Sequence, residues 1–343
     1  MAQVVERPLW EREVPGSSPG APNLIMTIFP ARICVYNQFH SPEQTVQESF
    51  SGGIKTVVST VFRTPFAFDK LVLSANFRTA TDGCLLLEVQ VQQQDTWTDF
   101  YKLGLLSGKF KTSFPPQKND FGKVETDELA LAMPAQAYRF RLKFYGDAEL
   151  LLLASSAVRT PFAYEEKAAS RLPAGAFAQS ISPISQMEQD FPYKRRICSP
   201  TSVCMALNAL GYCVPLEQVL PRVFDQTADL YGNWLFNCAA ASELGAQAFF
   251  RRFGSLAELA EFVTADSCVI ASIGFKKEEL PGAPLEKTSG HLVLVRGWEK
   301  NQVLVADPAA PTQESVLRAY DAKAFARAWL LNKQGAAYIV RRR

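Results

Sequence analysis

A cysteine beside a predicted helix start is the first residue in the sequence with the setting of a nucleophile. Cys198 opens the run Cys-Ser-Pro-Thr-Ser, in which Ser199 suits the N-cap position and Pro200 suits the first helical position. Cys198 is therefore expected directly ahead of a helix N-terminus. The unpaired N–H groups and the dipole of a helix stabilise an anion there, so we expect a reactive thiol of low pKa.

Histidine is scarce in this chain, which narrows the choice of a base for that thiol. There are two histidines, His40 and His291, and only His291 lies in the C-terminal half. It opens the apolar run Leu-Val-Leu-Val, which is typical of a buried strand, and the first residue of such a strand lies at a loop mouth. Because a thiol nucleophile needs a neighbouring base, we predict this role for His291. The alternative is that Cys198 and His291 are core residues without chemistry.

An aspartate at the end of the next predicted strand completes the set. Residues 291–296 and 302–306 have the apolar pattern of strands, and the short segment between them suits a hairpin turn. An antiparallel hairpin places the start of its first strand beside the end of its second, so His291 and Asp307 should be neighbours. A carboxylate at this place can hold the imidazole in one tautomer and orientation.

Acyl transfer by a thiol also needs hydrogen-bond donors for the oxyanion that develops on the substrate. The backbone N–H of Cys198 is one expected donor. Two side-chain amides just upstream, Gln186 and Gln189, are candidates for the second, and we prefer Gln186. This chemistry implies no organic cofactor. The chain has no Cys-x-x-Cys pair of the kind that binds zinc, so no metal is expected.

The elements that would position these residues form an α+β domain. Helical patterns come first and strands follow, an order that favours α+β over a doubly wound sheet. The predicted helices are 201–210, 234–245 and 255–263, and the predicted strands are 268–273, 291–296, 302–306 and 336–340.

The preceding part of the chain has a β pattern. Short runs rich in β-branched and aromatic residues, separated by turn clusters, favour an antiparallel β-sandwich, jelly-roll-like, over residues 25–158. The clearest runs are 55–62, 70–77, 85–92, 137–145 and 149–154, and the alternation from Leu87 onward predicts a half-buried strand. We therefore expect an N-terminal arm at 1–24, the sandwich at 25–158, a linker at 159–177 and the α+β domain at 178–343.

The bulk composition favours a soluble protein of two domains. With 343 residues the chain is too long for one ordinary core, and 48% hydrophobic with 20% charged residues is typical of a globular protein. A net charge of +2 does not indicate the basic surface that binds nucleic acid. No apolar run is long enough for membrane insertion. No secretion signal is seen, so a cytoplasmic location is expected. Seven scattered cysteines do not predict a disulfide framework.

Several motifs in the last half of the chain together resemble the C39-like cysteine peptidases of bacteria. They are the Cys-Ser-Pro-Thr-Ser helix start, Asn233-Trp234 ahead of an Ala-rich helix, the run from Gly290 to Gly297, Val305-Ala-Asp-Pro308, and Tyr320-Asp with Phe325 and Trp329. The resemblance covers roughly residues 175–343. It implies a papain-like fold, a Cys-His-Asp triad of Cys198, His291 and Asp307, and Gln186 in the oxyanion hole. Asn233 and Trp234 become candidates for the substrate cleft.

The leading hypothesis is a thiol hydrolase, a cysteine peptidase or amidase that forms an acyl-enzyme on a peptide or amide substrate. An acyltransferase that uses the same triad is one alternative. The other is a non-catalytic binding protein, with a degenerate peptidase fold and a sandwich that binds ligand. For that alternative, Trp97, Phe100 and Tyr101 are candidates for exposed aromatic contacts, although core packing also explains them and is the preferred interpretation.

Overall fold

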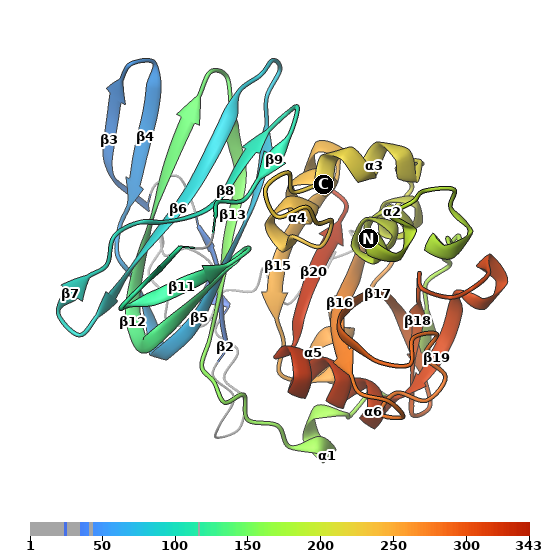
Figure 1. Ribbon diagram of the computed structural model, residues 1–343. Helices are drawn as coiled ribbons and strands as arrows, with labels where there is room; N and C mark the ends of the chain where they lie inside the picture. Colours follow the sequence, from blue (N-terminus) through green and yellow to red (C-terminus); the bar gives the residue numbers. More distant parts are fainter. Residues whose placement is uncertain (1–23, 26–34, 41–43, 116) are drawn as a thin grey trace, which may run out of the picture.

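The structure is a computed structural model that describes residues 24–25, 35–40, 44–115 and 117–343 (Figure 1). Nearly all of the predicted N-terminal arm, residues 1–24, lies outside these ranges. The described chain forms two antiparallel sheets, with helices gathered on the second, so the α+β class is confirmed. Among the described helices the longest, α2, has 12 residues, and none has the length and hydropathy to span a bilayer.

The first sheet contains the strands of the N-terminal part. They are β1 (Leu24–Ile25), β2 (Val35–His40), β3 (Thr45–Ser51), β4 (Ile54–Ser59), β5 (Phe62–Arg78), β6 (Cys84–Gln93), β7 (Thr96–Trp97), β8 (Tyr101–Ser107), β9 (Lys111–Thr112), β10 (Lys118–Asn119), β11 (Gly122–Glu125), β12 (Glu128–Tyr145) and β13 (Glu149–Val158). The long strand β12 pairs with β5 and β11 near its start and with β6 and β4 near its end. Hydrogen bonding thus joins the strands in one continuous system, and the two-sheet sandwich stays a prediction.

Strand β6 differs from the expectation that one of its faces is open to solvent. From Leu87 to Val91 both faces are buried, and Glu88 is only 1% exposed. Two arginines of β12 cover the polar face: the Nε atom of Arg141 lies 2.5 Å from Glu88 Oε2, and that of Arg139 lies 2.7 Å from Gln90 Oε1. The alternation is real, but the polar residues are paired with cross-strand guanidinium groups rather than with water.

The second sheet has the order β15-β20-β16-β17-β18-β19, with β14 beside β17, and all its pairings are antiparallel. Its elements, with the helices around them, are α1 (Glu166–Ala169), β14 (Ala176–Ala178), α2 (Cys198–Ala209), α3 (Leu216–Val223), α4 (Trp234–Glu243), β15 (Gln247–Arg252), α5 (Leu256–Ala260), β16 (Ser267–Phe275), β17 (Thr288–Glu299), β18 (Gln302–Ala306), β19 (Leu317–Asp321), α6 (Ala322–Ala326) and β20 (Ala336–Arg341). The four predicted strands are confirmed as β16, β17, β18 and β20.

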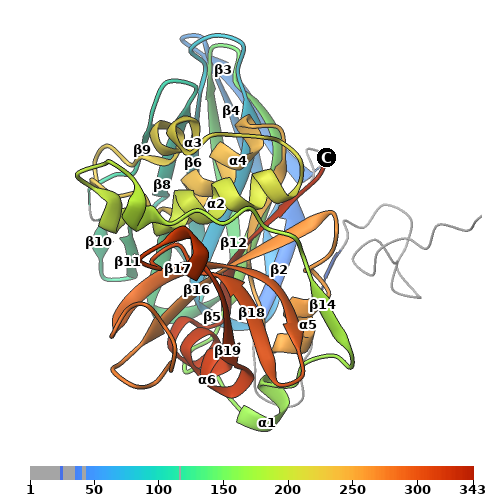
Figure 2. The same cartoon turned by 90° about the vertical axis from the view of Figure 1, so that its right-hand side faces the viewer.

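Each face of this sheet has its own apolar core. Helices α2, α3 and α4 pack on one face, against residues such as Ile270 and Leu294. Helices α5 and α6 pack on the other, against residues such as Val269 and Val293. Figures 1 and 2 show α2, α3 and α4 on one side of this domain, with α1 and α6 on the opposite side. The odd and even residues of the central strands β16 and β17 therefore face different cores, which is why their interiors are apolar rather than alternating.

The N-terminal strands cover the free edge of β15 with side chains. Strand β15 pairs with β20 on one side only, and every second residue of its other edge is bonded by a polar side chain. The N–H of Ala248 donates to Asn76 (3.1 Å), that of Phe250 to Ser74 (2.9 Å) and that of Arg252 to Asn37 (3.2 Å). The period of two matches the pleat of a strand, so these side chains stand where a further strand would pair.

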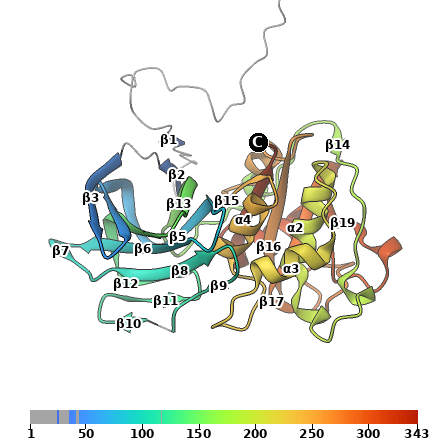
Figure 3. The same cartoon turned by 90° about the horizontal axis from the view of Figure 1, so that it is seen from above.

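Helix α4 belongs to the cores of both parts of the chain. Leu235 and Phe236 are completely buried among the apolar residues of the first sheet, whereas Cys238 and Ala241 pack against the second. Gly104 of β8 makes this approach possible, because a Cβ atom there would lie 2.8 Å from Leu235 and 2.9 Å from Phe236. Figure 3 shows α4 and β15 at the boundary between the two sheets.

Candidate active site

Cys198 is the first residue of α2, and the helix starts two residues earlier than expected. The N-cap is Ile197, so the prediction that Ser199 caps this helix is wrong. The Ser199 hydroxyl is instead buried and lies 3.0 Å from the hydroxyl of Tyr338 on β20. Pro200, within the first turn, still occupies a position whose N–H would have no acceptor in the helix. Cys198 as a residue is partly buried at this helix start.

The strand pair β17 and β18 brings His291 to Asp307. Leu294 lies opposite Ala306, which places the two residues near the same end of the hairpin. His291 Nε2 lies 2.7 Å from Asp307 Oδ1, and the two side chains are almost completely buried. The His291 side chain also hydrogen-bonds the Cys198 thiol. Because Nε2 is bound to the carboxylate, Nδ1 is the ring nitrogen left for the sulfur.

The Asp307 carboxylate is held by two further donors. The hydroxyl of Tyr320 on β19 donates to Oδ2 at 2.7 Å, and the N–H of Ala309 donates to Oδ1 at 2.9 Å. Charge-assisted bonds of this kind keep a buried carboxylate ionised and fix its orientation. Sequence reasoning missed the role of Tyr320, since only the pairing of β18 with β19, Val303 opposite Tyr320, places it there.

The electrostatics of the three residues favour a thiolate and an imidazolium. Burial by itself raises the pKa of Cys198, but the hydrogen bond and charge of His291, with the N–H of Leu292, outweigh it and lower that pKa. Burial lowers the pKa of His291, but the charge and hydrogen bond of Asp307 outweigh it and raise the pKa to about 10. The pKa of Asp307 is lowered, because His291 and Tyr320 outweigh its burial. The thiol proton therefore has a ready acceptor.

Gln186 is placed next to the loop that follows Asp307. Its backbone N–H donates to the carbonyl of Pro308 at 2.9 Å, and its side chain is 3% exposed. Its amide Nε2 donates to the carbonyl of Lys194 at 2.8 Å, which leaves one of the two amide protons for another acceptor. Gln189, the other candidate, donates its amide to the carbonyl of Ser185 within the same turn.

The two candidates for the substrate cleft lie at the junction with the N-terminal strands. Asn233 is completely buried, and its side chain accepts from the N–H of Phe236 as the N-cap of α4, so the prediction that it lines a cleft is wrong. Trp234 is partly exposed. Its ring stacks on that of Phe250, with centroids 4.6 Å apart. Its backbone N–H donates to the carboxylate of Asp127. The sequence motif marks a helix start that joins the two domains.

The aromatic residues considered as exposed contacts of the sandwich are buried or half-buried, in agreement with the preferred interpretation of core packing. Tyr101 is 3% exposed and donates its hydroxyl to Asn119 at 2.5 Å. Trp97 and Phe100 are half-buried, because the guanidinium groups of Arg139 and Arg141 lie over their rings. Cation–π contacts of this kind stabilise the sheet surface rather than leave it free for ligand.

Replacing Tyr320 by phenylalanine tests whether this residue positions the site. Loss of its hydroxyl removes a bond that lowers the pKa of Asp307, so the acid limb of the pH–rate profile should move to higher pH. We expect kcat to fall about tenfold with little change in KM, as for the loss of one hydrogen bond to a charged group. Tyr101→Phe, which also removes a buried hydroxyl, is the matched control. Equal effects of the two substitutions on the profile would contradict the role.

A thiol, an imidazole and a carboxylate joined by hydrogen bonds at a helix start form the kind of site that cysteine peptidases use. The chain belongs to the C39-like peptidase family. Residues 178–337 match the family described as "Peptidase_C39 like family", and residues 30–153 match "Peptidase C39 N-terminal domain".

Two solved structures are similar to about half of the chain. One is a double glycine motif protease from an AMS/PCAT transporter in complex with the leader peptide, with 21% identity and a TM-score of 0.36, covering 50% of this chain and 97% of that one. The other is a C39-like peptidase from Bacillus anthracis, with 16% identity and a TM-score of 0.37, covering 49% and 98%. No curated protein matches the chain.

Proposed function

We propose that the protein is a thiol hydrolase that cleaves a peptide or amide bond through an acyl-enzyme. The observation that carries this proposal is the chain of hydrogen bonds from Cys198 through His291 to Asp307 at the start of α2. A structural ion pair alone would not account for it, because a buried histidine with a raised pKa facing a thiol of lowered pKa is the setting of an activated nucleophile.

The residues would divide the reaction into two steps. The Cys198 thiolate bonds to the carbonyl carbon, and the carbonyl electrons move to an oxygen held by the Cys198 N–H and the Gln186 amide. The His291 imidazolium then gives its proton to the leaving nitrogen as the C–N bond breaks. In the second step a water gives a proton to His291 and bonds to the acyl carbon, and the C–S bond breaks. Asp307 would keep the ring oriented throughout.

We further propose the finer features of the fold. In this proposal residues 178–343 form a papain-like domain and residues 25–158 a jelly-roll-like sandwich, joined by the segment 159–177. The position of Cys198 at a helix start ahead of the antiparallel strands that carry His291 and Asp307 supports the first part. Two long strands with several partners each, β5 and β12, are compatible with the second.

Alkylation by iodoacetamide tests the proposed nucleophile. We expect Cys198 to be labelled faster than every other cysteine, with a rate that reaches its plateau at a lower pH than that of a free thiol in water. The plateau lies at a lower pH because the pKa of Cys198 is lowered and the thiolate forms above that pKa. His291 stays protonated up to about pH 10, so its charge stabilises the thiolate over this range. Mass spectrometry of the labelled peptides gives each rate. Faster labelling of any other cysteine would reject the proposal, and His291→Ala should return Cys198 to a slow, ordinary thiol.

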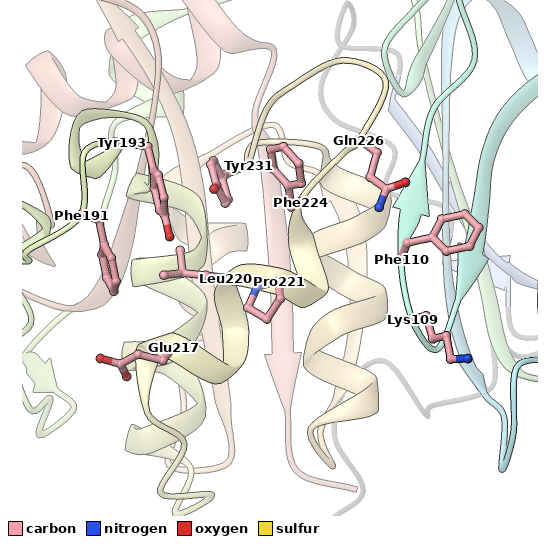
Figure 4. A pocket seen from close by; sticks show the side chains of 10 residues that line it. All are labelled: Lys109, Phe110, Phe191, Tyr193, Glu217, Leu220, Pro221, Phe224, Gln226 and Tyr231. Atoms are coloured by element: carbon pink, nitrogen blue, oxygen red, sulfur yellow. The ribbon is translucent and has the colours of Figure 1, made fainter.

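A cavity of about 360 Å³ lies beside the segment that leads into Cys198 (Figure 4). A row of rings lines it: Tyr193 stacks on Phe191 and on Tyr231, with centroids 5.4 and 5.2 Å apart. Figure 4 shows Phe110 and Lys109, from the N-terminal domain, on the opposite side. We propose that this cavity binds a large apolar side chain of the substrate.

Removal of the central ring tests this use of the cavity. Tyr193→Ala should raise KM about tenfold for peptides with a phenylalanine at the recognised position and leave kcat nearly unchanged, because stacking contributes binding rather than chemistry. Peptides with alanine at that position should respond less. Tyr145→Ala, a partly exposed tyrosine outside the cavity, is the control. A fall in kcat with unchanged KM, or an equal response of the two peptides, would contradict the assignment.

A further inference from the structure

A second cavity lies in the N-terminal domain, away from Cys198 and His291. Its volume is about 270 Å³, near the lower end of the roughly 300–1,000 Å³ that small-molecule sites occupy. The residues that line it come from β2, the β3–β4 hairpin, β12, β13 and the turn between β12 and β13. Figure 1 shows the arrangement of these strands. Apolar side chains make most of its wall: Val57, Phe140, Leu142, Phe144, Leu150 and Leu153. One nitrogen base, His40, also lines it.

A chain of hydrogen bonds around His40 assigns the tautomer of its ring. The hydroxyl groups of Tyr36 and Tyr138 both donate to Gln38 Oε1, at 2.8 and 3.3 Å. All of these contacts can be hydrogen bonds at once only when Ser155, 2.7 Å from the Tyr138 oxygen, donates to that oxygen, because each hydroxyl has a single proton. Ser155 then accepts from His40 Nε2 at 2.9 Å. The assignment that satisfies every contact places the proton of His40 on Nε2.

The other ring nitrogen, Nδ1, is left as a buried acceptor. His40 is 8% exposed, and Nδ1 has no hydrogen-bond partner among the described residues. Burial lowers the pKa of His40 to about 3, so the ring is neutral at physiological pH and cannot satisfy Nδ1 by taking a second proton. An unsatisfied buried acceptor is destabilising, and a ligand that donates a hydrogen bond to it regains that free energy.

The charges at this cavity are already paired with one another or with neighbours. Lys55 Nζ lies 2.9 Å from Glu48, and Arg78 Nε lies 2.7 Å from Glu149. A charged ligand would have to displace one of these partners, whereas a neutral ligand needs only the apolar wall and Nδ1. The chemistry of the lining therefore selects a neutral molecule.

We propose that this cavity binds a small neutral molecule that has an apolar body and a hydroxyl or N–H group, with that group donating to Nδ1 of His40. The site is independent of the peptidase chemistry proposed above. It gives the N-terminal domain a ligand of its own.

Two matched probes test the proposal on the full chain. 4-Ethylphenol can donate a hydrogen bond, and 4-ethylanisole, its methyl ether, cannot. The ether has more apolar surface, so an apolar cavity without an acceptor would prefer it. We expect the phenol to bind about tenfold more tightly in isothermal titration calorimetry, as for one buried hydrogen bond. Equal affinities, a preference for the ether, or no binding of the phenol at millimolar concentrations would overturn the proposal.

Three variants locate the binding. His40→Phe should lower the affinity for the phenol about tenfold and leave that for the ether within about twofold, because only the acceptor is lost. Ala148 lies on a turn that lines the cavity, so a tryptophan there should fill the cavity. Ala148→Trp should therefore abolish the binding of both probes although His40 is retained. Ala132→Trp, at an exposed position of β12 outside the cavity, is the control and should change neither. Unchanged binding in Ala148→Trp would place the probes elsewhere and reject the site.

Discussion

Cys198→Ala is expected to abolish turnover of a peptide mixture, with a loss of at least roughly 10⁴-fold in kcat. The substitution removes the only atom that can form the acyl-enzyme, whereas the helix start and the His291–Asp307 pair remain. Peptide products counted by mass spectrometry give the rate. Cys213→Ala, which removes an exposed free cysteine, is the matched control and should leave the rate unchanged.

His291→Ala should have nearly the same effect, and the double variant should be no worse than either single one. Residues that act as one catalytic unit are strongly non-additive, since the loss of one makes the other useless. Additive losses would show that Cys198 and His291 act independently. Residual turnover within tenfold of the parent protein would place the nucleophile elsewhere.

Phe236→Ala is expected to destabilise both domains together. The ring is completely buried in the core of the first sheet although its helix, α4, also packs on the second. Truncation of a buried phenylalanine costs about 3–5 kcal/mol of unfolding free energy. Because α4 is shared, we expect one cooperative transition whose midpoint falls, with tryptophan fluorescence and far-ultraviolet circular dichroism in agreement.

The matched control for this experiment is Phe50→Ala, at a side chain that is 71% exposed. It should change the unfolding free energy by less than about 0.5 kcal/mol. If Phe236→Ala instead produced two separate transitions, with only one of them shifted, the two domains would not share a core.

The sequence predicted those features that local patterns encode. A Pro near a helix start placed Cys198 at the N-terminus of α2, and a hairpin of apolar runs brought His291 beside Asp307. The predicted N-cap of α2, Ser199, lies two residues after the observed N-cap, Ile197. The Ser199 hydroxyl contacts the hydroxyl of Tyr338, a residue distant in the sequence, which no local pattern indicates. Whether the three residues act as a triad stays a prediction for the experiments above.

The features that sequence reasoning missed depend on contacts between distant segments. No local pattern shows that Asn76 covers the edge of β15, since its partner Ala248 lies in the other half of the chain. The same holds for Tyr320, whose hydroxyl reaches Asp307 only through strand pairing. Polar residues in such places look like ordinary surface residues in the sequence, because the periodicity of an element does not specify what packs against it.

The shared helix α4 has a consequence for synthesis of the protein on the ribosome. The last strand of the first sheet, β13, ends at Val158, but Phe236 is added about 80 residues later. At a translation rate of roughly 5–20 residues per second, on the order of 4–16 s pass between synthesis of the first sheet and synthesis of the side chains that complete its core. During that interval the apolar residues that will contact Leu235 and Phe236 are uncovered. A nascent protein in this state is a natural client for a chaperone that shields apolar surface until translation proceeds.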